Sequence, residues 1–216
     1  MLADTDTLFV FGLDHMVTGQ EATAAEVEAV RTWVNREGAR LVLGPHHDVG
    51  AGDDPAVRDM EYHHHGDALV PRQQRFGRYT RSLMEGLGVP VQNRYGLRPA
   101  VVGPNQVAPL SINRDLDTLG WLTGVTSFNF HMHLPHYAVT VDDEQAVRVL
   151  GRQPIDLSLP AHPFTEAGNT EFNMFLWLPP AGPRAGDILM ADSTIFSTLF
   201  GADESLRNFW RNIVTR

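Results

Sequence analysis

The strongest constraint on the fold is a strand–helix–strand pattern near the start of the chain. Residues 7–13 and 39–44 are short apolar runs rich in β-forming side chains. Between them, Thr23 and Glu26 have the spacing of a helix capping box, and an apolar stripe at helical spacing continues towards Gly38, which is expected to end the helix. Two strands joined by one helix are expected to be parallel, with a right-handed crossover. The sequence therefore predicts an α/β fold.

The rest of the chain predicts more strand than helix. Helices are expected at 55–64, within a long His-rich loop over 48–71, and at 72–87 and 203–214. Strands are expected at 99–102, 107–112, 173–178 and 186–191, and residues 125–141 alternate as a strand-rich segment with a turn at Leu134-Pro135. We therefore expect one α/β domain over residues 1–216 with a β-rich insertion at about 95–160.

Composition excludes several kinds of chemistry. The 216 residues include no Cys and no Lys, which excludes Cys nucleophiles, thiolate metal sites and Schiff-base lysines. The net charge is −9 and no Arg-rich run occurs, so nucleic acid and anionic membranes are not expected partners. No apolar run approaches 18 residues, and the first residues lack the basic charge of a signal peptide. We expect a cytoplasmic protein with a small-molecule substrate.

Two of the clusters formed by the ten histidines follow the first two expected strands. Asp14 and His15 come after the first strand, and His46, His47 and Asp48 come after the second. Ligands of parallel sheets bind beyond the carboxyl ends of the strands, so if the two strands are neighbours, both clusters face one crevice. Alternatively, the carboxylates only cap loops and the histidines are solvated.

A third cluster has the spacing of a strand-borne metal site. If the segment around it is a strand, Asn129, His131 and His133 share one face, because successive side chains alternate. Two such imidazoles can converge on one ion, with His46 or His47 as a third ligand. The alternative is a polar strand face with two exposed histidines.

A fourth cluster lies in the expected helix at 55–64. Glu61 and His65 are four residues apart and would share a helix face. Arg72 and Arg75, with Arg78 beyond them, are suited to hold an acidic substrate. The alternative is a mobile polar loop without a function. Together the clusters assign metal coordination to His46, His47, His131 and His133, acid–base roles to Asp48, Glu61, Asp14 and His15, and substrate contacts to Arg72, Arg75, His65, Asn129 and His136.

Roughly half of the chain also resembles a known superfamily. Residues 7–48, the stretch from His162-Pro163 to Gly168, and residues 186–193 with 208–212 resemble class I glutamine amidotransferase-like domains. The likeness is to the non-amidase branch, which includes trehalose-utilisation-like proteins and soluble domains of gliding-type ABC transporters. It implies a flavodoxin-like parallel sheet flanked by helices. It also implies a site near His46, where true amidotransferases carry a Cys nucleophile; without Cys, glutamine hydrolysis by that route is excluded.

A shorter stretch resembles a second family. Pro45-His46-His47-Asp48 is similar to the Pro-His-Pro-Asp-Asp motif of zinc-dependent sugar deacetylases, although Val49 replaces the second Asp. The resemblance implies metal chemistry rather than membership.

These observations predict a metal-dependent enzyme that acts on a small molecule by hydrolase- or lyase-type chemistry. Zinc is the first choice of metal, and Fe, Mn, Ni or Cu also suit imidazole and carboxylate ligands. One alternative is a non-catalytic ligand- or partner-binding domain. A second is a metal-independent enzyme that uses His46 and Asp48 as an acid–base pair. A homodimer could form through an exposed sheet edge or through the apolar face of the C-terminal helix.

Overall fold

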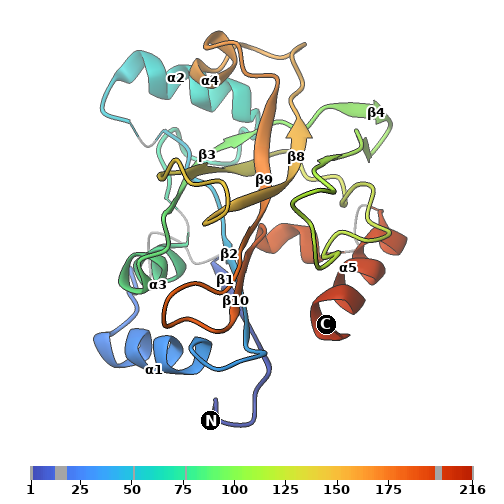
Figure 1. Cartoon of the computed structure of the whole chain (residues 1–216). Helices are drawn as coiled ribbons and strands as arrows, with labels where there is room; N and C mark the ends of the chain where they lie inside the picture. The colour runs from blue at the N-terminus through green and yellow to red at the C-terminus, as the bar shows by residue number, and fades with distance from the viewer. Residues whose placement is uncertain (1, 13–18, 51, 76, 198–200, 216) are drawn as a thin grey trace.

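The computed structural model has a mixed α/β fold (Figure 1) and describes residues 2–12, 19–50, 52–75, 77–197 and 201–215. The helices are α1 (Ala24–Val34), α2 (Pro55–His65), α3 (Arg78–Leu87), α4 (Pro163–Glu166), the 3-10 helix η1 (Ser193–Phe196) and α5 (Asp203–Thr215). The strands are β1 (Thr7–Gly12), β2 (Arg40–Pro45), β3 (Val91–Leu97), β4 (Val101–Gly103), β5 (Gln106–Val107), β6 (Ser111–Ile112), β7 (Leu134–Val139), β8 (Arg148–Pro154), β9 (Glu171–Leu178) and β10 (Asp187–Met190). Within the described ranges, no helix combines the length and the apolar character needed to cross a membrane.

The main sheet has six strands in the order β1-β2-β10-β9-β8-β6. Strands β1, β2 and β10 are parallel, whereas β9, β8 and β6 continue the sheet in antiparallel fashion. The α/β class is therefore confirmed. The flavodoxin-like order is not confirmed, because such a sheet has its first strand between two others and β1 lies at the edge here. A separate β-rich insertion is not confirmed either, since β6 and β8 belong to the main sheet.

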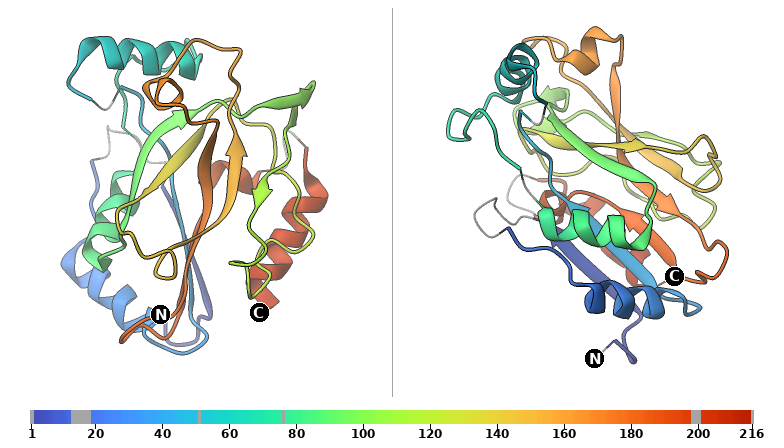
Figure 2. Two further views of the ribbon diagram at one scale, coloured as in Figure 1. Left: turned by 45° about the horizontal axis from the view of Figure 1, so that its top comes forward. Right: turned by 90° about the vertical axis from the view of Figure 1, so that its left-hand side faces the viewer.

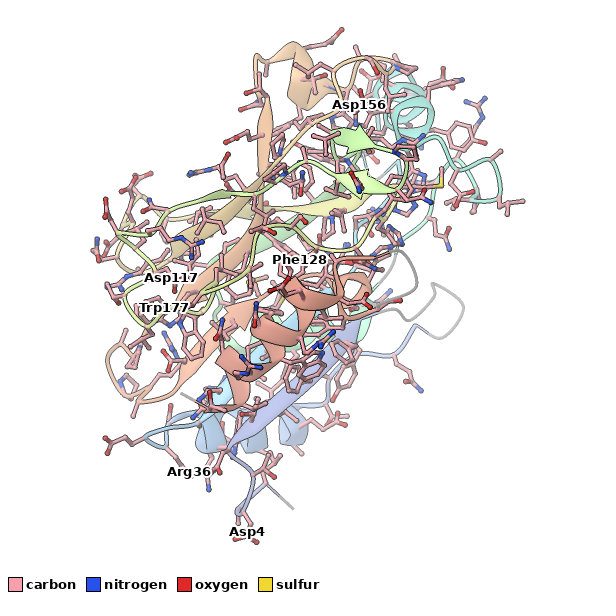
Figure 3. All side chains as sticks on the ribbon, turned by 90° about the vertical axis from the view of Figure 1, so that its right-hand side faces the viewer. Asp4, Arg36, Asp117, Phe128, Asp156 and Trp177 are labelled. Carbon is pink, nitrogen blue, oxygen red and sulfur yellow. The ribbon has the colours of Figure 1, made fainter. Side chains whose placement is uncertain are left out.

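Alternation along the central strands divides the core into two layers. Leu41 and Leu43 of β2 face the cluster that contains the buried side chains of α1 and α3, whereas Val42 faces the cluster that contains those of α5. Figure 2 shows α1 and α3 on one side of these strands and α5 on the other. On the α5 side lies Phe128, which is labelled in Figure 3. Its ring packs edge-on against Phe209 of α5, with centroids 5.2 Å apart. The carboxyl ends of β1 and β2 thus emerge between two packed layers.

The strand–helix–strand unit predicted from the sequence is present. Thr23 and Glu26 form the capping box of α1, and β1 and β2 are parallel neighbours. The helix ends at Val34, four residues before Gly38, so the predicted end was wrong. The reason is tertiary: the Val34 carbonyl accepts a hydrogen bond of 2.9 Å from the backbone N–H of Gly186, which leads into β10.

Two further element predictions are corrected. Helix α3 begins at Arg78 rather than at residue 72, because Gln74 pairs through both backbone groups with Val49, at 2.8 Å each. Residues 125–133 are a loop rather than a strand, and Leu134-Pro135 begin β7 instead of forming a turn. Strand pairing with β3 starts only at these two residues, which explains where the strand begins.

Candidate metal centre

Three buried histidines converge where β2 ends and β7 begins. His46 and His47 directly follow β2, and His133 directly precedes β7. One ring nitrogen from each lies within 4.8 Å of the other two, and this is the one such group found in the described part of the chain. The residues are 5, 0 and 7% exposed, respectively. Nitrogens of a tetrahedral zinc site lie about 3.3 Å apart for bonds of about 2 Å, so the group is close to the size that an ion requires.

Hydrogen bonds from several elements hold the backbone at Pro45 and His46. The Pro45 carbonyl accepts a hydrogen bond of 3.0 Å from the hydroxyl of Tyr137 in β7. The His46 carbonyl accepts from the side-chain amide of Asn93 in β3 and from the guanidinium of Arg81 in α3. Because three different elements hold this turn, the two imidazoles that follow it have a fixed starting point.

Asp192 orients the ring of His46. Its Oδ2 lies 2.9 Å from Nδ1 of His46, and its Oδ1 accepts from the backbone N–H of Thr194 at 2.8 Å. Burial raises the pKa of Asp192, but the His46 ring and the hydrogen bonds from His46 and Thr194 outweigh it, so the pKa lies below its usual value. The carboxylate is therefore ionised and favours a proton on Nδ1, which makes Nε2 the nitrogen that would hold a metal.

Sequence reasoning missed Asp192. It follows the apolar strand β10, which is parallel to β2, in the same way that Asp48 follows β2. The rule that placed the other two strand-end clusters at one edge would also have placed Asp192 there. The sequence therefore contained the signal for Asp192, but it did not show that β10 pairs in parallel with β2.

His47 and His133 contact each other through ring nitrogens. Nε2 of His47 meets Nδ1 of His133, while Nδ1 of His47 lies 3.2 Å from the Asp48 carbonyl. Burial lowers the pKa of both rings well below the usual value, and the neighbouring histidines lower it further. Both rings are thus neutral, which is the state that binds metal.

Gly96 of β3 makes room for the His47 ring. A Cβ added to Gly96 would lie 2.6 Å from Nδ1 of His47. Such a distance is not found in real structures, and the obstacle is a buried ring. A glycine is therefore required by close packing here, not by backbone conformation.

His65, at the end of α2, closes one side of the group. Its ring stacks on His133 with centroids 3.6 Å apart and planes 24° apart, and it lies 5.0 Å from the ring of His47. Burial lowers its pKa to about 4. Among the described residues, neither of its buried ring nitrogens has a hydrogen-bond partner.

His131 lies beside the three-histidine group without belonging to it. Its Nδ1 is 2.6 Å from the carbonyl of His133, and its ring centroid is 5.9 Å from that of His46. The expected convergence of the 131–133 segment with His46 and His47 is therefore present through His133. It arises from a loop that leads into β7 rather than from one face of a strand.

The other candidate residues lie at varying distances from the group. Asp48 is paired with Arg81, and Glu61 accepts a hydrogen bond of 2.9 Å from the backbone N–H of Gly50. Arg72, Arg75 and Arg78 are exposed, and of these Arg72 pairs with Asp59 and Arg78 with Glu21. Asn129 is buried and donates to the Thr194 carbonyl, and His136 is buried and stacks with Tyr95. Asp14 and His15 lie outside the described residues.

A cavity of about 530 Å³ lies next to Asp48 and Glu61. Its other walls come from α2, β3 and α4, and include the rings of Tyr95 and Phe164 and the side chain of Arg94. This volume is in the range of small-molecule sites, which combine apolar walls with a few polar groups. Glu61 and His65 are one helical turn apart on α2, so this cavity and the histidine group share one helix.

Comparisons with family models, with curated proteins and with solved structures found no match to this chain. The functional argument therefore rests on the site itself.

Proposed function

We propose that this protein is a metal-dependent enzyme that acts on a small molecule, with its metal held by His46, His47 and His133. The observation that carries the proposal is that ring nitrogens of three buried histidines lie close together. The buried carboxylate of Asp192 orients one of these rings, that of His46. Metal-binding histidines in proteins regularly have such a carboxylate behind them.

The donor set favours zinc. Three imidazoles and no sulfur suit zinc, and Fe, Mn, Ni or Cu are also compatible. Catalytic zinc sites use three protein ligands and keep a further position for water or substrate. A metal bound in this way would supply Lewis-acid chemistry, which favours hydrolase- or lyase-type reactions.

The adjacent cavity supplies the space for a small molecule. Asp48 and Glu61 lie in its wall. Because Asp48 is paired with Arg81, Glu61 is the carboxylate that would accept a proton from a substrate there. Arg94, also in the wall, would attract an acidic group. Arg72 and Arg75 are exposed and do not line this cavity, so we assign the substrate contact to Arg94 in their place.

The proposal is tested by combining metal binding with turnover. His46→Ala, His47→Ala and His133→Ala should each lose stoichiometric Zn²⁺ in calorimetric titration. His63→Ala is the control, because His63 is an exposed histidine of α2 outside the three-histidine group. Any activity found on a panel of esters, amides and hydroxy acids should be lost with a chelator and restored by Zn²⁺. Retention of Zn²⁺ in all three variants would contradict the proposal.

A second candidate function follows from the His46–Asp192 pair. An imidazole whose Nδ1 is held by a buried carboxylate can serve as a general base without any metal. The partner is Asp192 rather than Asp48, which is paired with Arg81. This function predicts an activity that survives chelation and is lost in His46→Gln.

The relation to class I amidotransferase-like domains stays a proposal as well. It is supported by the parallel β1–α1–β2 unit and by the position of His46 at the end of β2. It adds no activity to the argument, because the chain has no Cys.

A further inference from the structure

His65 is a buried polar side chain whose hydrogen-bonding nitrogens are not satisfied by the described residues. It is 1% exposed, and among the described residues neither ring nitrogen has a hydrogen-bond partner. Burying a polar group without a partner is costly, because the hydrogen bonds that it made to water are not replaced. Natural proteins rarely carry this cost without a reason, and the two rings beside His65 belong to the three-histidine group.

The surroundings hold the helix but not the ring. Helix α2 is anchored through Glu61, which accepts from the Gly50 N–H, and it ends at Gly66, whose left-handed backbone donates to the Tyr62 carbonyl. Among the described residues, the ring of His65 contacts the rings of His133 and His47 but makes no hydrogen bond. A side-chain rotation of His65 therefore breaks no hydrogen bond among the described residues.

We propose, on the basis of the metal centre proposed above, that His65 is the fourth imidazole ligand of the ion. In the loaded protein its ring leaves the stack on His133 and turns one nitrogen to the metal. Rings bound to one tetrahedral ion have centroids about 5 Å apart, given metal–nitrogen bonds of about 2 Å. The separation of 5.0 Å between His47 and His65 already fits, whereas the 3.6 Å between His65 and His133 must open by about 1.5 Å.

A fourth imidazole gives the centre two states. With His65 bound, the shell is closed, as in structural zinc sites; with His65 displaced, one position is open, as in catalytic sites. Helix α2 carries His65 and also lines the 530 Å³ cavity through Val57 and Glu61. A molecule that fills the cavity therefore touches the helix that presents the fourth ligand.

The test uses Co²⁺ as a spectroscopic probe in the whole protein. The wild-type protein should give an intense visible spectrum typical of four-coordinate Co²⁺ and should not respond to azide. His65→Phe keeps the stacked ring but removes both nitrogens. It should bind Co²⁺ at least about tenfold more weakly, because even the loss of a residue that only orients a ligand costs about 10–100-fold, and its spectrum should respond to azide. His63→Phe, at an exposed position in the same helix, should behave as wild type.

A measurement on the wild-type chain alone guards against misfolding of the variant. With ¹⁵N-labelled histidine, Zn²⁺ should shift the ring resonances of His46, His47, His133 and His65 to metal-bound positions. Three bound rings with an unshifted His65 would overturn the inference and leave the proposed metal centre intact. The same holds if His65→Phe matches wild type in affinity and azide response. No Co²⁺ or Zn²⁺ binding by wild type would overturn both.

Discussion

Nδ1 of His46 lies 2.9 Å from Oδ2 of Asp192, and both side chains are buried between β2 and β10. The pair links two parallel strands that are far apart in the sequence. Its chemical consequence is a fixed tautomer: with the proton on Nδ1 facing the carboxylate, Nε2 is left to hold a metal.

Asp192→Asn should therefore weaken metal binding by about 10–100-fold. An amide can donate to Nδ1 of His46 and so favours the proton on Nε2, the nitrogen needed by the ion. Affinity is measured by competition with a chelator of known strength. Asp59→Asn, the same change at an exposed carboxylate, is the control and should leave affinity unchanged. Equal affinities for the two variants would argue against a role for Asp192.

Gly96→Ala should disturb the centre by displacing the ring of His47. The added methyl would lie 2.6 Å from Nδ1 of this buried side chain, so ring or strand must shift. We expect a loss of about 1–3 kcal/mol in the free energy of unfolding together with weaker metal binding. In Gly52→Ala the new methyl has its nearest neighbour at 4.0 Å, which makes it a suitable control. Denaturant unfolding and metal titration of both variants decide the matter.

Arg81→Gln should destabilise the protein far more than Arg78→Gln. Arg81 pairs with Asp48, whose side chain is 5% exposed, and it also donates to the His46 carbonyl, whereas Arg78 pairs with Glu21 on the surface. Removing Arg81 takes the guanidinium partner away from the buried Asp48 carboxylate, which costs about 1–3 kcal/mol, whereas an exposed pair contributes about 0–1 kcal/mol. Similar free energies of unfolding for the two variants would show that the Arg81–Asp48 pair does not stabilise the fold.

The metal-free protein should lose stability in mild acid. Burial, with a smaller contribution from Arg94, lowers the pKa of His136 to about 4. Burial, with smaller contributions from His64 and His136, lowers the pKa of His162 to about 3. In the unfolded chain these two histidines have a pKa near 6.5. Below that pH the unfolded chain therefore binds more protons than the folded chain. Stability is fully present above pH 6.5 and falls as the pH drops, by about 2 kcal/mol per such residue at pH 5.

His162→Asn isolates one contribution to this pH dependence. The asparagine oxygen can still accept from the Phe164 N–H, which caps α4, but it cannot titrate. Unfolding by denaturant at pH 7.5 and pH 5 should therefore show a smaller difference in this variant than in wild type. An unchanged difference would mean that His162 is not the buried neutral ring described here.

Local sequence signals predicted the elements that local chemistry determines. The Thr23–Glu26 capping box and the apolar runs of β1 and β2 were sufficient for the first parallel unit. The end of α1 and the start of α3 were not predictable, because they depend on Gly186 and Val49, which are distant in sequence. Pairing between distant segments overrides helical periodicity at such boundaries.

The sequence predicted only some residues of the candidate centre by a rule that the structure follows. His46 and His47 lie where the strand-end rule places them. His133 joins them through a loop, and no pattern within residues 125–133 shows that this segment returns to β2. Asp192 and Gly96 act through contacts with His46 and His47 that only the folded chain reveals.

The central claim is that His46, His47 and His133 hold a metal ion. The most direct test is the metal content of untagged protein purified without added metal or chelator, measured by inductively coupled plasma mass spectrometry. We expect about one transition-metal ion per chain, most often zinc, and a loss of that ion in His133→Ala but not in His63→Ala. Protein that contains no metal and takes up none on titration would contradict it.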